Sequence, residues 1–217
     1  MFDDIILAQC ITSKISHDLA NVYNALYQSV DLLDDKDKKV RTQSMDLLKH
    51  SIVELGKRLR WIRETYGRVY NPEEKISDLK LRDILNELVN KNNIILDCQI
   101  HDDYYRSFTN LMEKLLIAIC ITASNQIAYG GKMSVILSPE KHQIFSVYVE
   151  SKTIAINEKY INTIMSPDYS VINVYNIEIV YIKKIADILK LGLTCEYNHS
   201  SFKYILFEKD STQLIQK

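Results

Sequence analysis

Residues 5–33 read IILAQCITSKISHDLANVYNALYQSVDLL, and apolar side chains return along this stretch at every third or fourth position. The apolar stripe consists of Ile11, Ile15, Leu19, Val22, Leu26 and Leu33, with Ser29 keeping the register. This spacing is typical of a long amphipathic helix and is close to the heptad pattern of helices that pack along their length.

A second helix of the same kind follows a charged turn, DDKDKK at 34–39. Residues 41–68 carry their own apolar stripe, made of Met45, Leu48, Ile52, Leu55, Leu59 and Ile62. Two long helices joined by a short polar loop predict an antiparallel hairpin. Because two helices alone cannot bury two heptad stripes well, we expect a second copy to complete a four-helix bundle, which makes the protein a homodimer.

The helical pattern ends at residues 67–75, GRVYNPEEK, which we interpret as a linker between domains at 1–70 and 76–217. Beyond the linker the pattern is mixed, and the predicted fold class is α+β: a helical hairpin followed by a small α/β sandwich. Helices are expected at Leu81–Lys91, from Asn110 with Glu113 as its capping-box partner, and at Ile177–Leu191. Strands are expected at Asn93–Ile100, Lys132–Ser138, Gln143–Val149, Thr194–Asn198 and Phe202–Glu208.

Composition limits the class of protein. The chain has 217 residues, of which 47% are hydrophobic and 25% charged, with a formal net charge of −1. These values indicate a folded protein and argue against a nucleic-acid or membrane-surface partner. The four scattered cysteines form no C-x-x-C pair, and the apolar run at 111–123 is too short to cross a bilayer. We therefore expect a cytoplasmic protein without a disulfide framework or metal site.

His17 lies on the first predicted helix, roughly 165° around the helical wheel from the centre of the apolar stripe. Four polar, uncharged residues fall within about 40° of it: Ser13, Asn21, Asn24 and Gln28. A solvated surface histidine is the simpler interpretation. A strip without lysine or glutamate, however, favours a surface that binds a partner.

The second helix adds positive charge at the same level. With the turn near residue 37, antiparallel pairing places His17 opposite residues 57–58, close to Lys57, Arg58, Arg60 and Trp61. Basic groups near an exposed imidazole suit a transient N-phosphoryl group, which carries about two negative charges. Alternatively, they form a basic surface favoured by the helix dipole. Trp61 either packs against the linker or contacts a partner.

Asp18 follows His17 directly. A carboxylate at this position can accept a hydrogen bond from Nδ1, fix the tautomer and leave Nε2 as the nucleophile. Asn21, one turn further on, can orient a water molecule or an acceptor. A metal site at His101-Asp102-Asp103 is the less favoured interpretation of that segment, which is expected to be a polar loop.

Three segments in this order resemble the ChpT-type histidine phosphotransferases of alphaproteobacteria, which are relatives of the two-component histidine kinases. They are SHDL at 16–19, RLRWIRETYG at 58–67 and SNQIAYGG at 124–131. The family tends to carry a proline soon after its histidine motif, whereas Val22 stands in that region here. The resemblance covers nearly the whole chain and implies a dimeric phosphotransfer hairpin followed by a degenerate kinase-like domain.

The kinase nucleotide site can be compared position by position. Asn125 matches a magnesium ligand of the kinase N-box, but the next motif, D-x-G-x-G, falls on Glu150, Lys152 and Ile154. The phosphate-binding glycine loop falls on NIEI at 176–179, with Glu178 where a triphosphate would lie. Since glycine is needed where backbone approaches phosphate, we expect no ATP binding.

The resemblance implies that His17, Asp18 and Asn21 relay a phosphoryl group between aspartates of receiver domains. It also implies that Ser13, Asn24, Gln28 and the basic residues of the second helix bind the partner. The chain would hold no cofactor, and Mg²⁺ would lie on the receiver. Expected partners are the receiver of a hybrid histidine kinase and receivers of regulators such as CtrA. Alternatives are an active kinase fragment, a dimeric scaffold without chemistry, and a phosphatase or phosphate sink.

Overall fold

The computed structural model describes residues 2–67, 77–89, 93–137, 143–155, 158–165, 172–173 and 176–209. The chain divides into two compact units, Met1–Gly67 and Arg68–Lys217, and each is described here by itself. Apart from Gly67, the predicted linker at 67–75 lies outside the described residues, as does the turn at 138–142.

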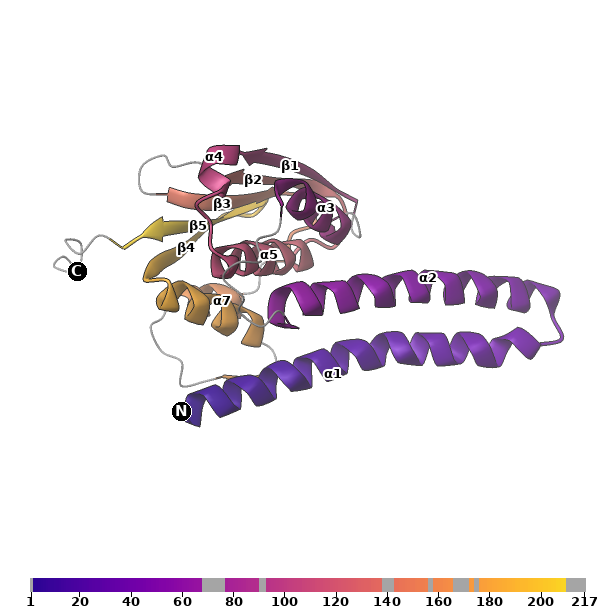
Figure 1. The fold of residues 1–217 in the computed structure, drawn as a ribbon. Helices are drawn as coiled ribbons and strands as arrows, with labels where there is room; N and C mark the ends of the chain where they lie inside the picture. The colour runs from indigo at the N-terminus through magenta and orange to yellow at the C-terminus, as the bar shows by residue number, and fades with distance from the viewer. Residues whose placement is uncertain are drawn as a thin grey trace. The chain divides into compact units, whose positions relative to one another are not determined.

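The first unit is the predicted helical hairpin. Helix α1 (Phe2–Asp31) leads through the short 3₁₀ helix η1 (Leu32–Asp34) into α2 (Lys38–Ile62), which ends in a π-helical turn, η2 (Arg63–Gly67). Figure 1 shows α1 and α2 running antiparallel. Asp37 caps α2, because its side chain accepts a hydrogen bond from the backbone N–H of Lys39 at 2.8 Å.

Two hydrogen bonds between the helices fix their register. Near the turn, the buried Ser44 hydroxyl donates to the carbonyl of Ser29. Further along, Arg58 Nη1 donates to the carbonyl of Asp18 at 3.2 Å. The predicted pairing of His17 with the level of residues 57–58 is therefore confirmed.

The predicted apolar stripe of the second helix is only partly correct. In α2 the fully buried positions are Ser44 and Ser51, whereas Met45, Ile52 and Leu59 are 40%, 56% and 49% exposed. Small serine side chains let the two backbones approach closely, so that the larger residues lie at the side of the contact. These three residues, seven positions apart, form an exposed apolar stripe.

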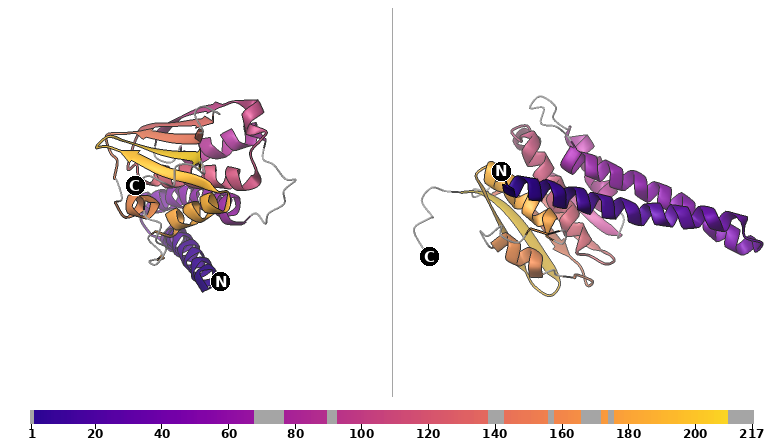
Figure 2. Two further views of the ribbon diagram at one scale, coloured as in Figure 1. Left: turned by 90° about the vertical axis from the view of Figure 1, so that its left-hand side faces the viewer. Right: turned by 90° about the horizontal axis from the view of Figure 1, so that it is seen from below.

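The second unit is a two-layer α/β sandwich. Its sheet contains β1 (Ile94–Ile100), β2 (Gly131–Leu137), β3 (Gln143–Glu150), β4 (Leu191–Tyr197) and β5 (Ser201–Glu208) in the order β1-β2-β3-β5-β4. Only the β1–β2 pair is parallel among these neighbours. Figures 1 and 2 show α3 (Asp78–Val89), α5 (Asn110–Asn125) and α7 (Ile177–Ile188) on one face of the sheet.

Helix α5 forms the centre of this unit. Its residues from Glu113 to Ser124 are all buried, and the sheet presents Met133, Val135 and Val147 as fully buried neighbours in the same core. The Phe108 and Phe145 rings extend the core, with centroids 6.3 Å apart. The expectation that 111–123 is a buried core helix is confirmed.

Several predicted details are wrong. Thr109 caps α5, and its capping-box partner is Met112 rather than Glu113, whose buried carboxylate accepts a hydrogen bond from the Tyr105 hydroxyl at 2.8 Å. Helix α7 ends at Ile188, because Lys190 adopts a left-handed φ of 59° and Leu191 begins β4. The short helices α4 (Asp102–Tyr105) and α6 (Glu158–Met165) were not predicted.

A glycine in β4 allows close cross-strand packing. Gly192 pairs with Phe207 of β5, and a Cβ atom built at Gly192 would overlap the Phe207 ring. The aromatic ring therefore occupies the space that a side chain at position 192 would need.

Candidate functional site

His17 stands near the middle of α1, and its side chain is 67% exposed. Its Nδ1 atom lies 3.3 Å from Oδ1 of Asp18. In the tautomer that carries a proton on Nδ1, this nitrogen donates to the carboxylate and Nε2 keeps its lone pair. In that tautomer the Nε2 lone pair is available, as the predicted role of His17 requires.

Asp18 has a second partner that the sequence interpretation missed. Its carboxylate is only 10% exposed, and Lys14 Nζ lies 3.1 Å from each of its oxygens. The i, i+4 spacing of Lys14 and Asp18 is a recognisable signal for such a pair on a helix. Asp18 therefore contacts two side chains, Lys14 on one side and His17 on the other.

The predicted polar strip lies on the outside of the hairpin. Ser13, Asn21, Asn24 and Gln28 are all exposed, as are the small neighbours Ser16 and Ala20. Their exposure agrees with the helical wheel, and their functional roles remain predictions. Small side chains around His17 leave the imidazole accessible to a large partner.

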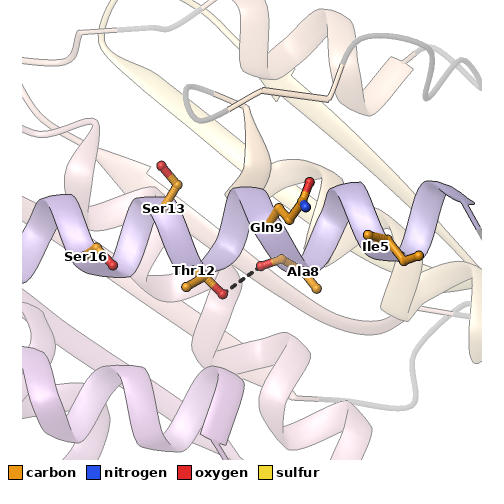
Figure 3. Close-up of a pocket in the computed structure, with 6 residues that line it drawn as sticks. All are labelled: Ile5, Ala8, Gln9, Thr12, Ser13 and Ser16. Carbon is orange, nitrogen blue, oxygen red and sulfur yellow. Dashed lines mark hydrogen bonds between the residues drawn. The ribbon is translucent and has the colours of Figure 1, made fainter.

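A shallow hollow adjoins this face on the N-terminal side of His17. Figure 3 shows its lining along α1, made up of Ile5, Ala8, Gln9, Thr12, Ser13 and Ser16. The Thr12 hydroxyl donates to the Ala8 carbonyl at 2.8 Å, so it turns back onto its own helix. The hollow presents mostly short side chains to the outside.

The predicted residues of the second helix differ in what they contact. Arg58 reaches α1 through the Asp18 carbonyl, whereas Lys57 pairs with Glu54 on its own helix at 3.5 Å. Arg60 is half-buried. Trp61 packs edge-on against Tyr66, with ring centroids 6.2 Å apart. Arg58 thus has a described contact with α1 at the level of His17, and the Trp61 contact favours packing.

Hydrogen bonds join the loop after β3 to the segment after α5. The kinase comparison expects a glycine motif in this loop. The Thr153 hydroxyl donates to the Tyr129 carbonyl at 2.6 Å and accepts from the Tyr129 N–H at 3.0 Å. Ala128 and Ala155 add backbone bonds to Thr153 and Gln126, and Ile127 bridges to Ile154. These backbone groups bond to each other, so they are not available to contact a nucleotide.

The first turn of α7 carries a carboxylate. Glu178 is buried there, two residues after the N-cap Asn176. A helix N-terminus attracts anions through its free N–H groups and its dipole. A buried glutamate at this position already supplies negative charge and opposes a bound phosphate.

The other reactive side chains lack activation. Burial raises the pKa of the Cys98 thiol to about 11 and that of Cys195 to about 12, so both stay protonated near neutral pH. Within the described ranges, no three His, Cys, Asp or Glu side chains gather as metal ligands, and His101 is exposed. No helix among the described residues has the length and hydropathy to cross a membrane.

The chain was compared with known proteins. No family model and no curated protein matches it. The fold is similar to the solved structure of a bacterial phosphotransferase, with 16% identity over 92% of this chain and 95% of that chain and a TM-score of 0.76. Weaker likenesses include the Acinetobacter baumannii histidine kinase AdeS, with 13% identity over 90% and 98% of the two chains and a TM-score of 0.45.

The phosphotransferase likeness spans both units, so the predicted order of helical hairpin and α/β sandwich is confirmed. At 16% identity the likeness concerns the fold. The narrower ChpT-type assignment and the roles of the site residues remain predictions.

Proposed function

We propose that this protein is a histidine phosphotransferase that relays a phosphoryl group between aspartates of receiver domains through His17, without binding ATP. The observation that carries the proposal is the exposed His17 imidazole whose Nδ1 faces the Asp18 carboxylate at 3.3 Å. The shared fold with a bacterial phosphotransferase supports it.

The chemistry follows from this arrangement. The Nε2 lone pair attacks the phosphorus of a receiver's aspartyl phosphate; the N–P bond forms while the O–P bond breaks, and the bonding electrons leave with the receiver's carboxylate. The ring then carries a positive charge, which Asp18 faces through the Nδ1 proton. Transfer to a second receiver reverses these steps, since both linkages are high in energy. The receiver supplies Mg²⁺ and its own aspartate.

The surroundings of His17 suit close approach by another protein. In-line transfer requires the reacting atoms to lie about 3–3.5 Å apart, and the exposed neighbours Ser13, Ser16 and Ala20 are small enough to permit this. Asn21, Asn24 and Gln28 offer neutral hydrogen-bonding groups to the receiver. The basic residues Lys57, Arg58 and Arg60 favour the negative phosphoryl group.

A homodimer is part of the proposal. The stripe of Met45, Ile52 and Leu59 on α2 is exposed in the single chain, and so are Tyr23, Tyr27 and Val30 on α1. The Tyr23 and Tyr27 rings stack with centroids 6.3 Å apart. On the helical wheel the α2 stripe lies roughly 90° from the buried serines of α2, and the α1 stripe lies roughly 120° from the buried Val22 and Ser29. A second copy would cover both stripes.

Independence from ATP rests on the α/β unit. The hydrogen bonds of Thr153 with Tyr129 close the loop that would approach a nucleotide, and Glu178 is buried where phosphate would sit. An active kinase fragment is therefore disfavoured. The scaffold alternative differs in predicting that His17 can be replaced without loss of function.

The deciding experiment is a phosphoryl-transfer assay. A receiver domain labelled with ³²P on its aspartate is incubated with the protein, and the label is expected on His17. The bond should be labile in acid and stable in alkali, as an N–P bond is. His17→Gln should abolish labelling and keep the oligomeric state, while the exposed His50→Gln serves as the control. Labelling that persists in His17→Gln would refute the assignment.

A further inference from the structure

The carboxylate of Asp18 is held from two sides. Lys14 Nζ lies 3.1 Å from Oδ1 and 3.1 Å from Oδ2, so it spans the whole carboxylate. His17 Nδ1 approaches Oδ1 alone, at 3.3 Å. The lysine therefore contacts both oxygens of the carboxylate, whereas the histidine contacts one.

The contact between His17 and Asp18 needs such support. Adjacent residues on a helix point roughly 100° apart, so their side chains do not face each other without a constraint. The Asp18 side chain is nine-tenths buried, and a carboxylate in that setting requires a compensating partner. Lys14, one turn earlier and 25% exposed, supplies the compensating charge, and the carboxylate that it contacts is the one that His17 Nδ1 approaches.

Two described contacts of α2 near this site involve atoms other than the Asp18 carboxylate. From α2, Arg58 binds the backbone carbonyl of Asp18 and not its carboxylate. Lys57 and Glu54 pair with each other on α2 at 3.5 Å. Neither contact orients the oxygen that His17 faces.

We propose that Lys14 is a positioning residue for His17: by holding the Asp18 carboxylate in place, it selects the imidazole tautomer with the proton on Nδ1 and the reactive lone pair on Nε2. The inference rests on the proposed function for its consequence in phosphoryl transfer. The selection of the tautomer itself is a property of the protein without any partner.

The first measurement therefore needs no partner protein. The ¹⁵N shifts of His17 in the ¹⁵N-labelled, unphosphorylated protein report the tautomer directly. Lys14→Met should lower the fraction of the Nδ1–H form, and Lys14→Arg, whose guanidinium can also span a carboxylate, should restore it. Lys49→Met, which removes an exposed lysine of α2, is the matched control and should leave the ratio unchanged. Circular dichroism and sedimentation confirm that each variant is folded.

The second measurement is the rate at which His17 takes up phosphate from a labelled receiver and from phosphoramidate, a small donor that needs no protein contact. Lys14→Met should slow both by about threefold to tenfold, the equivalent of losing one hydrogen bond. Slowing with the receiver alone would instead make Lys14 a docking residue and overturn the proposal. An unchanged tautomer ratio or a faster reaction would overturn it as well.

The two proposals fail separately. If no receiver labels the wild-type protein while the tautomer still depends on Lys14, the relay function is wrong and the positioning role stands. If the wild-type protein relays phosphate and Lys14→Met matches it in tautomer and in both rates, only the positioning role is lost.

Discussion

The α/β unit and the helical hairpin bury their apolar side chains to very different extents. Among the described residues, the hydrophobic side chains that are fully buried belong almost entirely to the α/β unit, and Val22 is the one from the hairpin. The hairpin instead exposes Tyr23, Tyr27, Val30, Met45, Ile52 and Leu59. The α/β unit buries a core of its own, whereas the hairpin leaves many of its larger apolar side chains exposed in the single chain. We therefore assign the dimer contact to the hairpin.

The two units also differ in what they offer to a phosphoryl group. Around His17 the hairpin presents small polar side chains and an accessible nitrogen. In the α/β unit, the segment that corresponds to the kinase nucleotide site is closed by its own hydrogen bonds. We therefore place the proposed reactive group on the helices and not in the α/β unit.

The largest effect should come from a charge on the exposed stripe of the hairpin. Ile52→Asp places two carboxylates in the expected dimer contact, where burial of unpaired charge should weaken association by at least about a thousandfold, or about 4 kcal/mol. Sedimentation velocity measures the result. Val53→Asp, at an equally exposed apolar position about 100° around α2 from Ile52, should remain dimeric. A wild-type protein that sediments as a monomer would refute the assignment of a dimer contact to the hairpin.

A core substitution in the α/β unit should have the next largest effect. Leu116 is fully buried in α5, and Leu116→Ala should lower the free energy of unfolding by about 2–5 kcal/mol through lost burial and a cavity. The dimer should persist. Leu79→Ala, at a 70% exposed position of α3, is the control and should change stability by less than about 0.5 kcal/mol. Urea titration separates the two, and equal effects would show that the unit lacks a core of its own.

Asp18→Asn should slow phosphoryl transfer by about tenfold to a hundredfold without abolishing it. The amide loses the charge that holds Lys14 and faces the imidazole, so the reactive tautomer is no longer favoured. Rapid-quench measurement of the labelled protein gives the rate. Asp187→Asn, which breaks a comparable ion pair with Lys209 in the α/β unit, should have no effect on it.

Arg58→Ala should slow transfer by about threefold to tenfold, and Arg60→Ala by less. Arg58 donates a hydrogen bond to the backbone carbonyl of Asp18, next to His17, and we therefore expect its loss to matter more. The same assay ranks the two variants. A larger loss in Arg60→Ala would mean that receiver binding, rather than the helix contact, governs this side of the site.

The last prediction is that the protein does not bind a nucleotide, so the expected signal is the smallest. Titration of the protein with Mg-ATP in a calorimeter should give no heat beyond dilution, because the loop at Thr153 is closed and Glu178 is buried at the helix N-terminus. An active histidine kinase domain provides the positive control. Micromolar binding would refute the interpretation of the α/β unit.

The sequence predicted the long elements well because their periodicity is strong. The stripe of α1 and the charged turn located the hairpin and its register, and alternating strands located the sheet. Helix α6 was missed because only its Ile161 and Ile164 are described as buried apolar positions, and its place against α7 and β4 depends on tertiary packing. The buried Ser44 and Ser51 were missed for a related reason, since polarity alone does not reveal a close helix contact.

The site was predicted in part. His17, Asp18 and the exposed strip follow from the helical wheel, which needs only the 3.6-residue repeat. Lys14 was overlooked although its spacing of four from Asp18 stands in the sequence. The contact of Arg58 with the Asp18 carbonyl required the structure, because side-chain reach across two helices depends on the distance between their axes.

The close packing of Phe207 over Gly192 predicts which residue pairs related proteins can carry at these two positions. Since a side chain at position 192 would collide with the ring, relatives that keep this strand pair should retain both residues or change both. A relative with a larger residue at 192 should carry a small one at 207. This paired variation offers a way to recognise distant members of the group when overall identity is too low to be informative.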